Sequence, residues 1–161
     1  MVKYKLLMIL CLLQVVCVYG RAQDHLKVKN IFDKYGKREG SILVQLSTDI
    51  LAPKTNITLY KSLIIGCRGV VEEDIVNAIK TDIVDGIIIS EAKKNGKIEY
   101  LTYYIENKIS KDNEFILYKN KGDKIILVYL NGKIPPRDLE TELGKLKDLL
   151  IYVNNKRIKL Q

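Results

Sequence analysis

The chain has no tryptophan, one histidine, three prolines and three cysteines among its 161 residues. So few Cys and His residues exclude a disulfide scaffold and a Cys/His-rich zinc module. The common active-site motifs Gly-x-Ser-x-Gly, His-Glu-x-x-His and Cys-x-x-Cys are also missing, as is a glycine-rich phosphate loop. We therefore expect no catalytic residues, no metal ligands and no cofactor.

The composition is that of a folded domain, with 47% hydrophobic and 29% charged residues. This balance excludes a disordered chain, because enough apolar surface is present to offset the entropy lost on folding. Its length fits one domain. A net charge of +8 suggests nucleic acid as a partner, but the beginning of the chain argues against that partner.

The N-terminal segment predicts export. Two lysines among the first five residues precede the apolar run 6–19, which only Gln14 interrupts. The run is shorter than the roughly 20 residues that cross a bilayer as a helix. Small residues follow at Gly20 and Ala22, as at the cleavage site of a secretory signal peptide. A buried N-terminal helix and a lipoprotein signal fit this segment less well.

We therefore expect residues 1–22 to be a signal peptide that is removed before Gln23, with a cut after Gly20 as the second choice. Its removal lowers the net charge to +5 and leaves Cys67 as the single cysteine. A lone thiol forms no internal disulfide, so the core must stabilise the domain unaided. An exported protein rarely meets nucleic acid, and we expect none as a partner.

Hydrophobic periodicity predicts an α+β fold with one domain at 23–153 and a basic tail at 154–161. The expected order is α-β-β-α-β-β-β-β-α, which gives an antiparallel sheet of about six strands with helices packed on it. The expected elements are helix 24–35, strands 41–48 and 57–65, a helix with the stripe Val71, Ile75, Ile79 and Ile83, strands 87–94, 97–106, 114–119 and 124–130, and a helix after Pro135-Pro136.

Turn and cap residues mark the boundaries of these elements. Asp24 is suited to cap the first helix, and Gly36 is expected to end it in the left-handed conformation. Asn95-Gly96 is a strong hairpin signal, and the segment 120–123 predicts a second hairpin with a longer loop. Residues 51–56, which include a proline, are expected to form a loop.

The strands 114–119 and 124–130 are apolar on both faces, which is typical of central strands. We expect helices to cover one face of the sheet. The other face is covered by a further helix, or it is a tyrosine-lined surface that meets a partner.

Several segments together carry a resemblance to a known kind of protein. They are the Lys-rich signal segment and the strings 32–37, 43–47, 59–63, 115–119 and 128–132. The chain resembles small exported proteins of Bacteroides-type bacteria that are classified as domains of unknown function. The resemblance implies a Gram-negative envelope location and a single α+β domain, and it implies neither an activity nor site residues.

Tyrosine is the most distinctive residue type, with 10 Tyr in the chain and several on expected strands. We expect Tyr100, Tyr104, Tyr118 and Tyr129 to share one sheet face that binds a protein or a glycan. Tyrosine suits such a surface because it joins an apolar ring to a hydroxyl group. The alternative is that they are ordinary tyrosines at the rim of the core.

The basic residues Lys93, Lys94 and Lys97 cluster at one hairpin. They are either solvated turn residues or a weak contact with anionic lipid or polysaccharide. Cys67 next to Arg68 is expected to be an incidental turn cysteine. The alternative is a thiol redox or dimer-linking role, because the Arg is of a kind that lowers a thiol pKa. The acidic run 72–74 is expected to complement a helix dipole rather than bind a metal.

The sequence thus predicts a non-enzymatic, exported binding or interaction module of the periplasm or cell envelope. Its partner is an unknown envelope protein or glycan, or a second copy of the chain. One alternative is an envelope structural or stress protein that associates with anionic lipid or lipopolysaccharide through its lysine clusters. A hydrolase with an unrecognised site is a lesser alternative.

Overall fold

The computed structural model describes residues 26–152. The expected signal peptide 1–22, the cap residue Asp24, the single His25 and the basic tail 154–161 lie outside the described residues. Within residues 26–152, no helix is both long and apolar enough to cross a membrane.

One antiparallel sheet of six strands organises the fold, in the order β1-β2-β6-β5-β4-β3. The α+β class and the six-stranded sheet confirm the expectation from sequence. The strands are β1 (Ile42–Ser47), β2 (Ile57–Gly66), β3 (Ile87–Lys94), β4 (Lys97–Ile105), β5 (Asn113–Asn120) and β6 (Lys124–Gly132). The central position of β5 and β6 explains why both strands are apolar on both faces.

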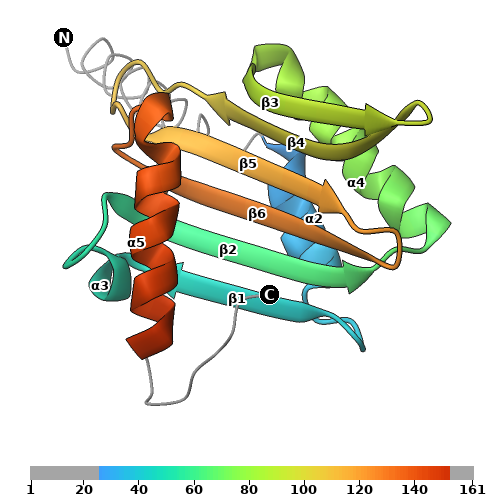
Figure 1. The fold of residues 1–161 in the computed structure, drawn as a ribbon, viewed down its shortest axis with the longest axis horizontal. Coiled ribbons are helices and arrows are strands. Elements are labelled where there is room, and N and C mark those ends of the chain that lie inside the picture. The colour runs from blue at the N-terminus through green and yellow to red at the C-terminus, as the bar shows by residue number, and fades with distance from the viewer. Residues whose placement is uncertain (1–25, 153–161) are drawn as a thin grey trace, which may run out of the picture.

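Helices lie on both faces of the sheet (Figure 1). The helices α2 (Lys27–Tyr35) and α4 (Gly69–Asp82) cover one face, and α5 (Leu139–Tyr152) crosses the other. Each face carries its own hydrophobic cluster, one with Phe32 and Ile75 and the other with Leu139 and Leu146. The short helices are α3 (Thr48–Leu51) and the 3-10 turns η1 (Ile83–Asp85) and η2 (Pro136–Asp138).

The ends of α2 differ from the expectation. The helix begins after Leu26, and the carboxylate of Asp82 at the end of α4 accepts hydrogen bonds from the N–H groups of Lys27 and Val28, each at 2.8 Å. Gly36 adopts the right-handed helical conformation, so the predicted left-handed stop is wrong. A glycine is needed there because a Cβ would lie 2.5 Å from the Phe32 carbonyl oxygen.

A bulge in β2 changes which residues share a face. The pairing with β6 shifts between Ile57 and Leu59. Ile57 therefore joins the cluster under α5, whereas Leu59 and Leu63 belong to the cluster under α2 and α4. Strict alternation would place all three residues on one face, because an alternating pattern contains no signal for the extra residue.

The two edges of the sheet are β1 and β3. The side chain of Ile42 on β1 is 58% exposed, and Ile87 on β3 is 52% exposed. Residues 48–51, expected as the end of a strand and the start of a loop, instead form the one-turn helix α3, which buries Leu51. A four-residue helix is too short to produce a periodic pattern in the sequence.

Candidate functional site

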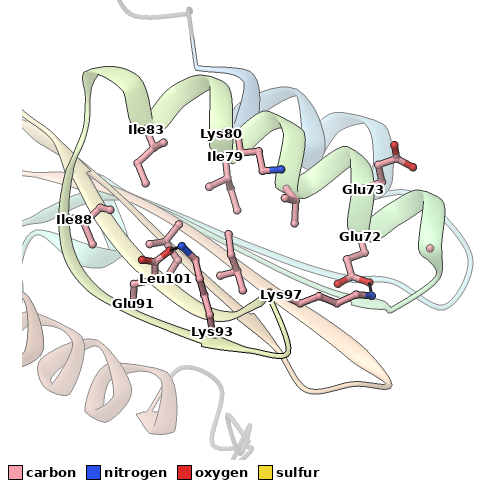
Figure 2. A pocket seen from close by; sticks show the side chains of 14 residues that line it. Glu72, Glu73, Ile79, Lys80, Ile83, Ile88, Glu91, Lys93, Lys97 and Leu101 are labelled. Atoms are coloured by element: carbon pink, nitrogen blue, oxygen red, sulfur yellow. Dashed lines mark ion pairs between the residues drawn. The ribbon is translucent and has the colours of Figure 1, made fainter.

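A groove of about 660 Å³ runs between α4 and the β3–β4 hairpin (Figure 2). Its floor is apolar and includes Val76, Ile79, Ile83, Ile88, Ile98 and Leu101. Its volume lies within the range of ordinary ligand sites. Four other hollows on residues 26–152 are smaller, with volumes of about 410 to 540 Å³.

Helical spacing on α4 and pairing between β3 and β4 build the two walls. Val76, Ile79 and Ile83 recur at intervals of three and four residues, so they project from one side of the helix. Opposite them, Ile88 pairs with Tyr103 on the face that also carries Leu101. Ile79 and Leu101 are buried in the core below, whereas Ile88 is 49% exposed. The groove is thus an open extension of the hydrophobic core.

The rim of the groove carries charges of both signs. Lys97 Nζ lies 3.7 Å from Glu72 Oε2, and this ion pair joins β4 to α4. Lys93 Nζ lies 3.1 Å from Glu91 Oε1 within the hairpin. Lys80 also lies at the rim. Because the carboxylates balance the lysines, the groove presents no single-sign field to a ligand.

Cys67 lies next to one end of this groove, where its Sγ is 3.7 Å from Glu72 Oε2. Burial, and secondarily the negative charge of Glu72, raise the pKa of the Cys67 thiol above its usual value. This is opposite to the lowering that the adjacent Arg68 suggested. A protonated thiol is a poor nucleophile. The thiol therefore has the properties of a structural cysteine.

The four tyrosines named as a binding surface do not share a face. Tyr118 and Tyr129 each have 2% of their surface exposed and belong to the cluster beneath α2 and α4. Tyr100 and Tyr104 lie on the opposite face, where Tyr104 stacks on Phe115. The expectation of one shared tyrosine surface is therefore wrong. It failed because the central strands are buried on both faces. The sequence therefore does not show which face of the sheet each tyrosine occupies.

Burial raises the pKa of the Tyr118 hydroxyl to about 12. The hydroxyl of Tyr129 instead donates a hydrogen bond of 2.6 Å to Glu114 Oε1, which Lys29 Nζ also contacts at 2.8 Å. Lys29 lies over the ring of Tyr129 as well, 5.1 Å from its centroid. These contacts tie α2 to β5 and β6. Tyr129 thus has structural partners inside the domain, and Tyr118 is buried in the hydrophobic core.

Tyr100 is the most accessible of the four tyrosines, at 40% exposed. It borders a shallow hollow of about 410 Å³ on the α5 face, together with Thr102, Leu117, Ile126 and Val128. This part of the α5 face remains open beyond the end covered by α5 (Figure 1). Of the predicted tyrosine surface, this half-covered patch is the part that is open to a ligand.

The three lysines of the predicted basic cluster divide between two hollows. Lys93 and Lys97 line the groove beside α4, where each pairs with a carboxylate. Lys94 and Lys97 border a smaller hollow of about 440 Å³ at the hairpin tips, to which Lys121 adds a third positive charge. The lysines are therefore adjacent, as expected, but two of them are partly neutralised.

The acidic run 72–74 does not converge on one point. Glu72 faces Lys97 and Asn120, whereas Asp74 accepts hydrogen bonds from the Lys34 ammonium and the Tyr35 hydroxyl. Lys34, and then Tyr35, hold the pKa of Asp74 below its usual value. Across residues 26–152, no three side chains of His, Cys, Asp or Glu are grouped as metal ligands.

Sequence reasoning missed the groove itself. From sequence, its floor residues Ile79 and Ile83 are indistinguishable from the rest of the apolar stripe predicted for this helix. The signal that was present is the run Ile87-Ile88-Ile89 at the start of an expected strand. Successive side chains of a strand point to opposite faces of the sheet, so three adjacent apolar residues cannot all face the core. Here each of the three is between 41% and 52% exposed.

A comparison with curated proteins finds no match to this chain. Residues 15–143 match a family described as a "Family of unknown function (DUF6108)". The matched segment includes α2, α4, all six strands and the start of α5. Since this match covers most of the sequence, the chain belongs to the DUF6108 family.

Proposed function

We propose that this protein is a non-enzymatic, exported interaction module, and that the groove between α4 and the β3–β4 hairpin binds an apolar segment of a partner protein. The observation that carries the proposal is the apolar floor formed by Val76, Ile83 and Ile88 inside a charged rim. An apolar centre with a polar rim is the usual anatomy of a protein interface.

The charges on the rim favour a protein segment over an anionic surface. Glu72 and Glu91 pair with Lys97 and Lys93, so an anionic surface would meet carboxylates as well as ammonium groups. An amphipathic peptide with side chains of both signs can pair with such a rim while its apolar residues occupy the floor. A protein partner therefore fits the groove better than lipid or a polyanion.

The export part of the proposal rests on the basic start and the apolar run 6–19, and the Bacteroides-type origin rests on the resemblance described above. We propose the periplasm or envelope of a Gram-negative bacterium as the location. Cell fractionation followed by N-terminal mass spectrometry tests this part. The proposal predicts Gln23 as the first residue of the exported protein, and an intact Met1 in the cytoplasm would contradict it.

The groove is tested by selecting displayed peptides on the wild-type protein and measuring their dissociation constants for two variants. Val76 is half-buried at the groove, whereas Val70 on the same helix is 72% exposed and does not line it. We expect Val76→Glu to weaken binding at least ~10-fold and Val70→Glu to leave it unchanged. Failure to enrich any peptide, or equal binding to both variants, would contradict the proposal.

A second candidate function is favoured by the lysines at the hairpin tips, Lys94, Lys97 and Lys121. We propose it as the alternative: an envelope structural or stress protein that contacts anionic lipid or lipopolysaccharide. It predicts that the protein sediments with vesicles containing anionic lipid, and that added salt releases it. Binding to neutral and anionic vesicles alike would exclude it.

A further inference from the structure

The edge strand β3 combines exposed apolar side chains with an open hydrogen-bonding edge. Within residues 26–152, no strand lies beyond it in the sheet. Its side chains Ile87, Ile88 and Ile89 are 52%, 49% and 41% exposed, and Val84 just before the strand is 80% exposed. A long apolar edge strand of this kind is a template for pairing with another chain. Figure 1 shows β3 at the upper margin of the sheet.

We propose that β3 pairs antiparallel with β3 of a second copy of this chain, so that the sheets of the two copies become continuous. In such a pair a two-fold axis crosses the strand, and each residue faces a partner that is fixed by the register. The proposal concerns the edge of the sheet and does not depend on the ligand of the groove.

A bulge in β3 selects the register. Ile88 pairs with Tyr103 and Ser90 with Thr102, so Ile89 is an extra residue in the strand. The bulge reverses the usual alternation: Ile87 and Ala92 share the α5 face because their partners are Tyr104 and Tyr100. An axis between Ile89 and Ser90 therefore places residues of the same face opposite one another, namely Ile87 with Ala92 and Ile88 with Glu91.

The same register brings opposite charges together. It places Lys94, at the end of β3, beside Asp85 of the other copy, just before the start of that strand. Both side chains are exposed, and neither has an ion pair within residues 26–152. Within one chain they lie more than about 20 Å apart, because an extended strand rises about 3.3 Å per residue. Their charges are therefore complementary between copies and not within one.

Charge complementarity and the matching of faces both specify a second copy as the occupant. The lysine at the end of an edge strand normally opposes association. In the antiparallel self-pair it contributes to association, because each Lys94 meets Asp85. The same register places each exposed Ile89 opposite Ser90 of the other copy, next to the axis where both bulges meet.

Sedimentation velocity tests this proposal on the full chain, expressed in an exporting Gram-negative host and purified in the form that the cells accumulate. We expect the sedimenting mass to double as concentration rises. Asp85→Lys alone and Lys94→Asp alone should each weaken the dimer at least ~10-fold, because each places like charges opposite each other. The double variant should restore the dimer, since the reversed pair is again complementary.

Matched variants at the two sheet edges provide the control. Ile87→Lys on β3 should abolish the dimer, whereas Ile42→Lys on β1, with similar exposure, should leave it intact. Thermal unfolding of each variant checks that the domain still folds. A monomer at all concentrations with strong hydrogen-exchange protection along β3 would mean that a segment of the same chain covers the edge, and it would overturn the proposal. Loss of the dimer with Ile42→Lys, or failure of the charge reversal to restore it, would overturn it as well.

Discussion

Lys97 Nζ lies 3.7 Å from Glu72 Oε2, so an ion pair connects the first residue of β4 with the first turn of α4 at the rim of the groove. Below this pair, apolar residues of α4 and β4 such as Val76 and Ile98 line the same groove. This ion pair contributes to the charge balance at the rim of the groove.

Replacing Lys97 with Met should change the free energy of unfolding by less than ~1 kcal/mol. The Lys97 side chain is 76% exposed, and exposed ion pairs contribute little to stability because water screens them. Chemical denaturation with urea measures the change. A loss of several kcal/mol would show that the pair is a structural clamp rather than an adjustable part of the rim.

The carboxylate of Asp82 should contribute more to stability than an exposed carboxylate on the surface does. It caps α2 from the end of α4, and only 6% of its residue surface is exposed. Asp82→Ala leaves two backbone N–H groups without this acceptor, so we expect a loss of about 2 kcal/mol. Asp33→Ala, on the exposed side of α2, is the control and should change the unfolding free energy by less than about 0.5 kcal/mol.

Substitution by alanine should change the stability of the protein in opposite directions at two glycines, Gly132 and Gly144. A Cβ on Gly132 would lie 2.2 Å from the Asn56 carbonyl oxygen, where β6 meets the start of β2. Gly132→Ala should therefore destabilise the protein by more than about 2 kcal/mol. Apart from the backbone of α5 itself, no atom of residues 26–152 lies within 4 Å of such a Cβ on Gly144, so Gly144→Ala should stabilise by about 0.5–1 kcal/mol. Thermal unfolding followed by circular dichroism compares the two variants, and a shift in the same direction for both would contradict this account.

Glu142 should make the docking of α5 dependent on pH. Burial alone would raise its pKa, but hydrogen bonds from Lys145 and from Asn56 outweigh burial and hold the pKa below its ordinary value of 4.5. Because the folded pKa is lower than the unfolded one, the stabilisation is complete above about pH 4.5 and is lost as the pH falls through the folded pKa.

Glu142→Gln should therefore cost about 1–3 kcal/mol at pH 7, and the difference from wild type should shrink as the pH falls below 4.5. Denaturation curves across this pH range measure the effect. Glu140→Gln, an exposed neighbour on the same helix, is the control. A difference that grows toward acid pH would contradict the assignment of Glu142.

The elements of the fold follow from sequence where the pattern is local. Asn95-Gly96 predicts the β3–β4 hairpin. These two turn residues both have positive φ values, 51° and 75°. The apolar pattern of β5 and β6 predicts their central place. The cap of α2 was not predictable in this way, because its acceptor Asp82 comes from 55 positions along the chain.

The candidate site was harder to predict than the fold, because it depends on which elements become neighbours. Tyr118 and Tyr100 both lie on strands with a plausible open face, and only the packing of α2 and α4 shows that Tyr118 is buried while Tyr100 remains 40% exposed. The lysines were located correctly at one hairpin. Their pairing with Glu72 and Glu91 needed the position of α4 and the register of β3.

The central claim is that the groove between α4 and the β3–β4 hairpin binds a partner segment, and nuclear magnetic resonance tests it residue by residue. A selected peptide is titrated into the isotope-labelled protein while backbone amide shifts are followed. The account predicts that the largest shifts fall on Val76, Ile83, Ile88 and Leu101, which line the groove. Shifts concentrated instead around Tyr100 and Thr102 on the α5 face, or around Lys94 and Lys121 at the hairpin tips, would contradict it.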